Sequence, residues 1–489
     1  MKHTLAHTAT RQLTSLALCF AAATDLHAAD VHPTFQPRAS ATPQAGGPAS
    51  RPNIVFIFAD DWGWGDLSCH GHPYVKTPNL DRLAKEGTDF SRFTVASGVC
   101  SPSRTAVMTG HFPARYNIDG HFAWAKNNAQ RNMPDWLDPK TPTLPKMLQS
   151  AGYATAHFGK WHLSNDMIPD SPLPKAYGYD EYGAFNCAGE QMPVHEDADH
   201  AIAFIKKSAA ANKPFFINLW MHEPHTPFHT VPKYEWRFPD MESREDQIFA
   251  SVLSHADDRI GHVLDALERL NLTENTLVVF SSDNGPARSA RPAKLELSYD
   301  TATGAGWGIA ASKGTTAGRK GYKAALFEGG INVPFIARWP GKIAAGKIDN
   351  ASLISAVDLL PTFCELAGAR PPDGYQPDGI SQVTTLKGNA TPTRSKPLFW
   401  RMDGAWPPKA DAPFHWATYA VVDRQWKLLS NRNGSHTELY DIAADPLETK
   451  DLASDKPGVV QEIMSTLNQW KSTLPEKPNS DVFSAERSK

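Results

Sequence analysis

Hydrophobic and polar positions change along the chain in a pattern that predicts strands alternating with helices from residue 51 onward. A nearly unbroken apolar run at 53–59 is typical of a strand buried on both faces. Further apolar runs predict strands at 153–157, 214–221, 277–280 and 334–338. Helices are predicted at 78–86, 143–151, 197–211, 245–270 and 357–367. This alternation predicts an α/β fold: a large domain with a mostly parallel, mixed sheet sandwiched by helices.

The character of the sequence changes after a stretch rich in proline and glycine at 369–392, which is interpreted as a linker or long loop. Beyond it lie short strand-like segments at 417–422, 426–429 and 438–440, and an amphipathic helix is predicted at 457–473. This pattern predicts a small antiparallel α+β subdomain. Because 489 residues exceed what one core usually supports, we assign 51–380 to the large domain and 381–489 to the C-terminal subdomain.

The first 50 residues have the composition of an export signal followed by a flexible segment. A positively charged start precedes a short apolar run at 13–23 and then small residues, so residues 1–29 are interpreted as a signal peptide. That run is too short to span a bilayer, and no later stretch is long and apolar enough. Residues 30–50 are rich in Ala, Pro, Gly and Ser and are interpreted as a flexible linker. The sequence therefore predicts a periplasmic or secreted protein without a transmembrane segment.

Composition and charge narrow the class of protein. Hydrophobic residues make up 41% and charged residues 21% of the chain, which excludes a disordered, collagen-like or coiled-coil protein. The net charge of −3 gives no general attraction to nucleic acid or anionic lipid, so no nucleic-acid partner is expected. Five cysteines are too few for a disulfide scaffold, so each must be explained by its own surroundings.

Polar side chains follow four of the predicted strands at the point where each strand ends. The groups are Asp60 with Asp61, Lys160 with His162, His222 with Glu223 and His225, and Asp283 with Asn284. Ligands of open α/β sheets bind outside the carboxyl ends of the strands, so these groups are expected to converge. Carboxylate and amide oxygens suit Ca²⁺ or Mg²⁺, and adjacent carboxylates are poorly tolerated without a cation. A metal site is the favoured interpretation, with helix capping or a turn as the alternative.

A segment containing Cys100 offers a candidate nucleophile. Polar residues before a short apolar run closed by Gly110 predict a helix that begins at about Ser103, with Cys100 just ahead of it. Backbone N–H groups at a helix N-terminus and the nearby Arg104 favour a thiolate. From the residues alone, Cys100 is either a reactive thiolate or a buried structural cysteine.

This segment resembles the signature of the type I, formylglycine-dependent sulfatases of the alkaline phosphatase superfamily. Residues 100–110 match the family pattern C-x-P-S-R-x-x-x-x-T-G. Further family motifs occur in the family's order at 60–66, 77–83, 159–163, 224–227, 282–285 and 327–330, and segments 426–428 and 439–446 resemble the family's small domain. The first motifs are similar to those of carbohydrate sulfatases of the arylsulfatase A and N-acetylgalactosamine-6-sulfatase kind. The resemblance covers nearly all of the chain after residue 50.

The resemblance implies a sulfuric ester hydrolase in which a maturation enzyme oxidises Cys100 to formylglycine (3-oxoalanine). In that family one hydroxyl of the hydrated aldehyde attacks sulfur, and the second helps to expel the sulfate. The resemblance also implies one Ca²⁺, which stabilises the nucleophile and polarises the sulfate. The implied metal ligands are Asp60, Asp61, Cys100, Asp283 and Asn284.

The remaining catalytic roles are carried over to matching positions. Arg104 would support the modified residue, and His162 would hydrogen-bond the hydrated aldehyde. Contacts with the sulfate or the leaving oxygen would come from Lys160, His225 and Lys323. Lys323 is preferred over Lys313 because it lies five residues before Glu328, which is the family spacing.

The expected substrate is a sulfated carbohydrate. His121, Asn186, Glu190 and Arg288 lie near motif segments and are candidates for sugar contacts. Aromatic residues in polar loops also suit a sugar, although core packing is the commoner reason for such residues; they are Phe122, Trp124, Trp136, Phe185, Trp307, Trp406 and Trp416.

Two alternatives remain beside the sulfatase interpretation. A phosphomonoester or phosphonate monoester hydrolase could use the same fold, because phosphate and sulfate esters share a tetrahedral anionic geometry. A non-catalytic protein that binds sulfated glycans could also have this scaffold, although the expected catalytic residues are all present.

Overall fold

The computed structural model describes residues 51–288, 297–300, 304–307, 311–389, 394–403 and 413–487, with only the backbone described for 297–300 and 304–307. The predicted signal peptide (1–29) and linker (30–50) lie outside the described residues. Residues 50–489 form one compact unit. Within the described ranges, no helix combines the length and apolar character needed to cross a membrane.

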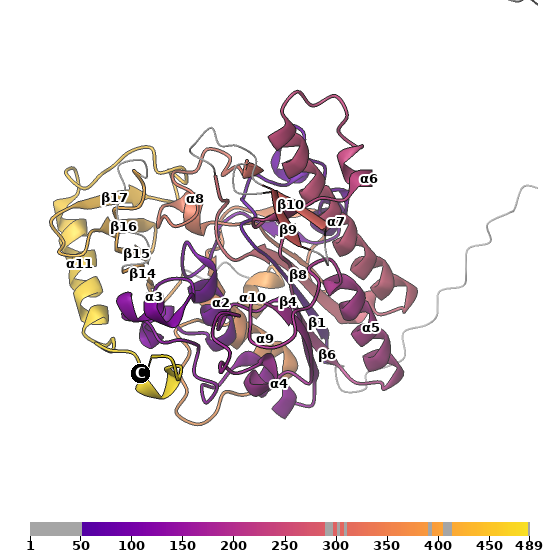
Figure 1. The fold of residues 1–489 in the computed structure, drawn as a ribbon. Helices are drawn as coiled ribbons and strands as arrows, with labels where there is room; N and C mark the ends of the chain where they lie inside the picture. Colours follow the sequence, from indigo (N-terminus) through magenta and orange to yellow (C-terminus); the bar gives the residue numbers. More distant parts are fainter. Residues whose placement is uncertain are drawn as a thin grey trace, which may run out of the picture. The chain divides into compact units, whose positions relative to one another are not determined.

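A mixed sheet forms the centre of the fold (Figure 1). Its eight strands lie in the order β12 (Lys347–Asp349), β2 (Thr88–Phe90), β11 (Phe335–Arg338), β8 (Thr276–Ser282), β1 (Asn53–Ala59), β6 (Phe215–Trp220), β4 (Ala154–Lys160) and β5 (Glu181–Phe185). The strands from β8 to β5 pair in parallel, whereas β11 runs antiparallel to both β8 and β2. The predicted fold class is thus confirmed.

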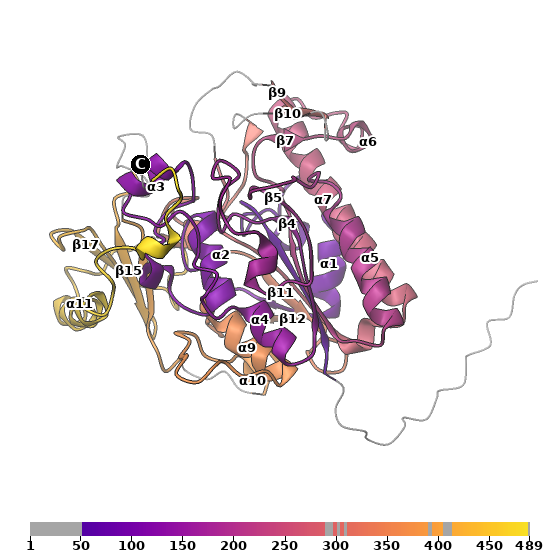
Figure 2. The ribbon, with the colours of Figure 1, turned by 60° about the horizontal axis from the view of Figure 1, so that its bottom comes forward.

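Helices cover both faces of this sheet (Figure 2). One layer contains α1 (Pro78–Glu86), α5 (Asp197–Ala210) and α7 (Arg244–Arg269); the other contains α2 (Cys100–Thr109), α4 (Leu144–Ser150) and α9 (Leu359–Ala367). Strand β1 explains why the apolar run is unbroken. Its side chains alternate between two cores, with Phe56 in the core that includes α2 and Ile57 in the core that includes α7.

The C-terminal part forms a separate antiparallel sheet, which confirms the predicted small α+β unit. Its strands are β14 (Leu398–Arg401), β15 (Tyr419–Asp423), β16 (Trp426–Ser430) and β17 (Thr437–Asp441), accompanied by helix α11 (Pro457–Lys471). Strand β14 was not predicted, because four residues after a proline carry little periodic signal. The boundary predicted after residue 380 falls just before the short helix α10 (Val383–Leu386) and stays a prediction.

The small sheet packs against the large domain through buried contacts. The Trp400 indole donates a hydrogen bond to the Val95 carbonyl at 2.7 Å. Lys427, which is fully buried, pairs with Glu328 at 2.8 Å and with Glu448 at 2.9 Å. The remaining short elements are α3 (Ala125–Gln130), α6 (Pro232–Glu235), α8 (Glu328–Ile331), β3 (Phe93–Thr94), β7 (Phe228–His229), β9 (Leu297–Asp300), β10 (Gly304–Trp307) and β13 (Ile354–Ser355).

Candidate active site

The four polar strand ends meet at one edge of the central sheet. Strands β8, β1, β6 and β4 are neighbours in the sheet and run parallel, so their carboxyl ends lie side by side. Strand β4 is longer than predicted, and Lys160 is its last residue. The sheet topology therefore brings together residues that are distant in sequence. Trp62 and Ser282, for example, are 220 positions apart, and their backbone N–H and side-chain oxygen are hydrogen-bonded at 2.9 Å.

Three carboxylates form a buried acidic cluster. Oxygens of Asp60, Asp61 and Asp283 lie within 4.8 Å of one another, and all three side chains are buried. Asp61 has a φ of 65°, a left-handed conformation that aspartate tolerates better than most residues and that turns the chain just after β1. The buried oxygens Asp60 Oδ1 and Asn284 Oδ1 have no hydrogen-bond partner. Such a set of hard, partly unsatisfied oxygen donors fits a divalent cation of the Ca²⁺ type.

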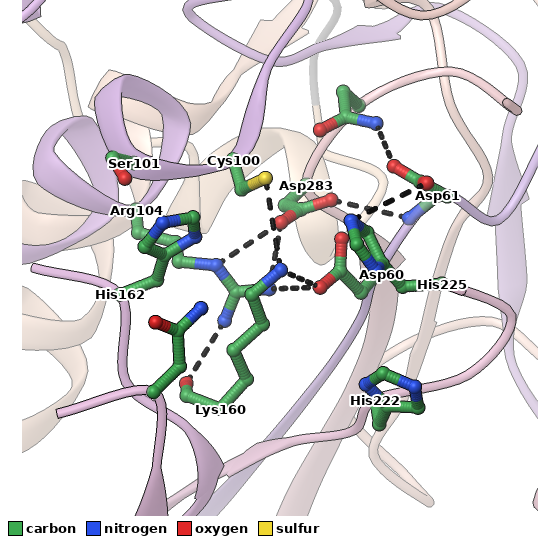
Figure 3. A network of polar contacts seen from close by, with 12 residues as sticks. Asp60, Asp61, Cys100, Ser101, Arg104, Lys160, His162, His222, His225 and Asp283 are labelled. Atoms are coloured by element: carbon green, nitrogen blue, oxygen red, sulfur yellow. Dashed lines mark hydrogen bonds and ion pairs between the residues drawn. The ribbon is translucent and has the colours of Figure 1, made fainter. Parts of the chain in front are cut away.

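Three basic side chains, Arg104, Lys160 and Lys323, surround the acidic cluster; Figure 3 shows Arg104 and Lys160. The Lys160 amino group donates to Asp60 Oδ2. Arg104 donates from Nε and Nη2 to Asp283 Oδ2 at 3.0 and 2.6 Å, and from Nη1 to the Lys160 carbonyl at 3.1 Å. Lys323 Nζ lies 2.7 Å from Asp61 Oδ2. These ion pairs lower the cost of burying the carboxylates, and Arg104 also fixes the end of β4.

The pKa values of the carboxyl groups diverge. Burial raises the pKa of Asp283 to about 7, with a further contribution from the nearby Asp60 carboxylate. Burial also raises the pKa of Asp61. Burial acts on Asp60 in the same sense, but Lys160, His225 and Arg104 outweigh it and hold that pKa well below its usual value. Without a bound cation, the three carboxyl groups therefore differ in how readily they ionise, and Asp60 ionises most readily.

Cys100 lies beside the cluster, but its local structure differs from the prediction. Helix α2 begins at Cys100 itself and not at about Ser103, because residues 100–103 already have helical conformation. Figure 3 shows the sulfur directed toward Lys160, and the Sγ–Nζ distance is 3.7 Å. Burial outweighs the lysine and raises the pKa of the thiol to about 11. Of the two interpretations left open by the sequence, a reactive thiolate or a buried cysteine, the burial of Cys100 therefore favours the protonated thiol for the unmodified side chain.

Two histidines face the same region. His225 Nδ1 donates to the Thr226 carbonyl at 2.5 Å, which leaves Nε2 on the side of Asp61 Oδ2, 3.9 Å away. Burial, Lys160 and Lys323 hold the pKa of His225 well below its usual value, so its imidazole is neutral. His162 Nε2 donates to the Phe122 carbonyl at 3.1 Å, and the buried Nδ1 has no hydrogen-bond partner.

A cavity of about 870 Å³ opens above these groups. Its lining contains these candidate residues from the sequence: Asp61, Cys100, His121, Phe122, Trp124, Lys160, His162, Phe185, Asn186, His225, Arg288 and Lys323. Asp60, Arg104, Asp283 and Asn284 are buried and do not line the cavity. The cavity thus has a charged floor and an aromatic wall in which Trp124 keeps 54% of its surface exposed.

Other candidates lie elsewhere. Lys313 pairs with Glu245 at 2.6 Å and is absent from the cavity lining, as is the exposed Glu190. Trp136 belongs to a separate small cluster with Ile168 and Val482, and Trp416 packs against Phe327 and His436. Only the backbone of Trp307 is described, and Trp406 lies outside the described residues.

Sequence reasoning missed several cavity residues. Gln191, Tyr322 and His415 line the cavity without following a predicted strand or a quoted family motif, and Asn165 lies two residues beyond the motif at 159–163. His415 lies shortly before β15 in the sequence, yet its Nε2 donates to the Lys323 carbonyl at 3.1 Å. No local signal in the sequence indicates this contact, because it depends on how the small sheet packs.

Comparisons with known proteins identify families and relatives whose sequences are similar to this chain. A family model described as Sulfatase matches residues 52–369, and one described as N-sulphoglucosamine sulphohydrolase, C-terminal, matches residues 320–475. The chain is 32% identical to the N-acetylgalactosamine-6-sulfatase of Canis lupus familiaris over 396 residues, covering 73% of this chain and 69% of the relative. It is 26% identical to the N-acetylgalactosamine-6-O-sulfatase of Bacteroides thetaiotaomicron, covering 87% of this chain and 94% of the relative.

A solved structure has a similar fold. The crystal structure of Ps i-CgsB in complex with k-i-k-neocarrahexaose gives a TM-score of 0.70 at 25% sequence identity. The similarity covers 88% of this chain and 96% of that chain.

Proposed function

The chain belongs to the sulfatase family, and from this premise we propose that it hydrolyses sulfate esters of a carbohydrate with a formylglycine formed from Cys100 and one bound Ca²⁺. One observation carries the proposal. Cys100 lies in the floor of the cavity, 3.7 Å from Lys160 and beside three buried carboxylates, of which Asp60 has an oxygen without a hydrogen-bond partner. This arrangement supports the proposal, because Cys100 lies between the acidic cluster and a cavity of about 870 Å³.

The residues proposed to hold Ca²⁺ are Asp60, Asp61, Asp283, Asn284 and the modified Cys100. The unpartnered oxygens Asp60 Oδ1 and Asn284 Oδ1 support this assignment, because a buried oxygen without a hydrogen bond is costly unless it binds a cation. When bound, the ion would polarise the sulfate group and stabilise negative charge on the attacking oxygen. Arg104 orients Asp283 through two hydrogen bonds and so acts as a positioning residue.

The lysines are proposed to bind the sulfate, and His225 is proposed to donate a proton to the leaving oxygen. Lys160 and Lys323 supply fixed positive charge where the transition state gains negative charge. His225 presents Nε2 to the cavity; an anionic ester beside it would favour its protonated form and let it protonate the leaving oxygen. His162 Nδ1, which has no partner, is proposed to hydrogen-bond the hydrated aldehyde.

A sulfated carbohydrate is the proposed substrate class. The names of two relatives refer to N-acetylgalactosamine-6-sulfate, and one similar structure holds a neocarrahexaose. The aromatic wall formed by Phe122, Trp124 and Phe185 suits the apolar face of a sugar ring, and His121 and Arg288 are proposed to contact its polar groups. The signal-like pattern of residues 1–29 supports export to the periplasm or the medium, where such polymers are met.

An aryl sulfate is expected to be a better substrate than the matching aryl phosphate, by at least about tenfold in kcat/KM. The physical reason is the second negative charge of a phosphate monoester, which the three carboxylates beneath the cavity repel. Release of p-nitrophenol from both esters by the matured enzyme measures the ratio. A large preference for phosphate would favour the phosphomonoester hydrolase alternative, and binding of sulfated glycan without any turnover would favour the non-catalytic one.

Calcium is expected to stabilise the folded protein. Adding Ca²⁺ to chelator-treated protein at about one hundred times its Kd should stabilise it by about 2.7 kcal/mol, which a thermal melt detects as a higher Tm. Asn284→Ala removes one proposed ligand and should reduce the rise in Tm that Ca²⁺ causes. Asn350→Ala serves as the matched control, because Asn350 is an exposed asparagine directly after the edge strand β12. An unchanged Tm on addition of Ca²⁺ to the wild type would contradict a calcium site.

A further inference from the structure

A second cluster of possible metal ligands lies outside the acidic cluster. Ligand atoms of His195, Glu223 and His255 lie within 4.8 Å of one another. The three residues come from different elements: His195 precedes α5, Glu223 follows β6, and His255 lies within α7. None of them belongs to the proposed calcium site, and the family motifs gave them no role.

The atoms that converge in this cluster lack hydrogen-bond partners. They are His195 Nε2, Glu223 Oε1 and His255 Nδ1. Glu223 is only 1% exposed, and its Oε1 lies 3.4 Å from His195 Nε2. A buried carboxylate oxygen without a hydrogen bond costs folding energy, so this position calls for a further partner.

The other carboxylate oxygen is already held. Arg259 Nη2 donates to Glu223 Oε2, while Arg259 Nη1 donates to the Val194 carbonyl at 2.9 Å and lies 3.4 Å from Asp197 Oδ1. Arg259 and Asp197 thus fix the orientation of Glu223 and direct Oε1 toward the two imidazoles. Metal-binding carboxylates commonly have such an outer layer of hydrogen bonds.

We propose that His195, Glu223 and His255 form a second metal site, which binds a divalent transition-metal ion of the Zn²⁺ type. Two imidazole nitrogens and one carboxylate oxygen are a donor set that suits Zn²⁺, whereas Ca²⁺ prefers oxygen ligands throughout. The metal would link the segment after β6 to α7 and to the start of α5. The same segment carries His225, and its Glu223 carbonyl accepts a hydrogen bond from the Asp60 N–H at 3.3 Å. Metal binding would therefore also help to hold His225 in position.

Zinc binding by the full chain tests this site independently of catalysis. We would use a Cys100→Ala background, because Asp60, Cys100 and His225 also cluster within 4.8 Å and a thiol could bind Zn²⁺. Saturating Ca²⁺ would keep the acidic cluster filled. At about pH 7.5, where unperturbed imidazoles are neutral, we expect one Zn²⁺ per chain with a Kd below about 1 µM. Dialysis with elemental analysis measures the stoichiometry, and Co²⁺ as a visible-light probe reports the nitrogen ligands.

Matched histidine variants decide the location. His195→Ala and His255→Ala should each weaken Zn²⁺ binding by at least about 100-fold, because loss of a ligand should cost no less than the upper end of the roughly 10–100-fold range seen when a hydrogen-bond partner of a ligand is lost. His200→Ala, on α5 and 47% exposed, should bind Zn²⁺ like the parent. Circular dichroism and the Tm of each variant without zinc establish that it is folded. A folded parent that retains no Zn²⁺, or equal binding by all three variants, would overturn the proposal.

Discussion

Replacing Cys100 by alanine is expected to abolish sulfate release, with kcat/KM falling by roughly 10⁴-fold or more, as when other enzymes lose their nucleophile. Alanine cannot be oxidised to the aldehyde, so the group proposed to attack sulfur is never formed. The fold should persist, because the sulfur is a small buried group in contact with the Lys160 amino group at 3.7 Å. Sulfate release from an aryl sulfate, together with a thermal melt, measures both effects.

A second cysteine provides the matched control for this experiment. Cys69 is exposed and does not line the cavity, so Cys69→Ala should keep full activity. Mass spectrometry of the peptide that contains residue 100, from protein made with a maturation enzyme, should find the aldehyde or its hydrate in the wild type. Full turnover by Cys100→Ala, or an active wild type that contains only the unmodified thiol, would point to a different nucleophile.

Lys323→Ala is expected to lower kcat/KM by roughly 10²–10³-fold, the range seen when one preorganised stabilising group is removed. Lys323 lines the cavity and pairs with Asp61 at 2.7 Å, so its charge lies next to the place proposed for the sulfate. The loss should appear for aryl sulfates as well as for sulfated sugars, because the sulfate group itself is affected. Steady-state kinetics on both substrate types, in saturating Ca²⁺, checks this result.

Lys313→Ala is the natural control for that variant, since both lysines lie in the same stretch of sequence. Lys313 pairs with the partly exposed Glu245 at 2.6 Å and does not line the cavity, so its loss should change kcat/KM by less than about twofold, as is usual for a surface ion pair. If Lys313→Ala lowered kcat/KM more than Lys323→Ala, Lys313 and not Lys323 would be assigned as the sulfate-binding lysine.

Much of the central fold could be predicted from apolar periodicity. Strand β1 matches the predicted range, and helices α1, α5, α7 and α11 agree with theirs to within two residues at each end. The edge strands β5 and β12 and the neighbouring strand β2 were missed. They have only three to five residues, and β5 and β12 lie partly at the surface, so neither a long apolar run nor clear alternation marks them.

The candidate site could be predicted where it follows strand ends, and less well elsewhere. Asp60, Asp61, Asp283 and Asn284 were expected to converge because parallel strands deliver their carboxyl ends to one edge. The start of α2 was misplaced, since Val99 precedes the helix without a side-chain cap and leaves no capping signal in the sequence. The high pKa of the Cys100 thiol also escaped prediction, because burial depends on neighbours distant in sequence.

By itself, the sequence determined the α/β class, the small antiparallel sheet, the family and the groups of carboxylates, lysines and histidines at strand ends. These properties depend on local periodicity and on motifs that stay close together along the chain. Only the tertiary structure decided which oxygens lack partners and that His195, Glu223 and His255 meet. These features depend on contacts between elements that are distant in sequence, and the pattern of residues along the chain does not record the distances between such elements.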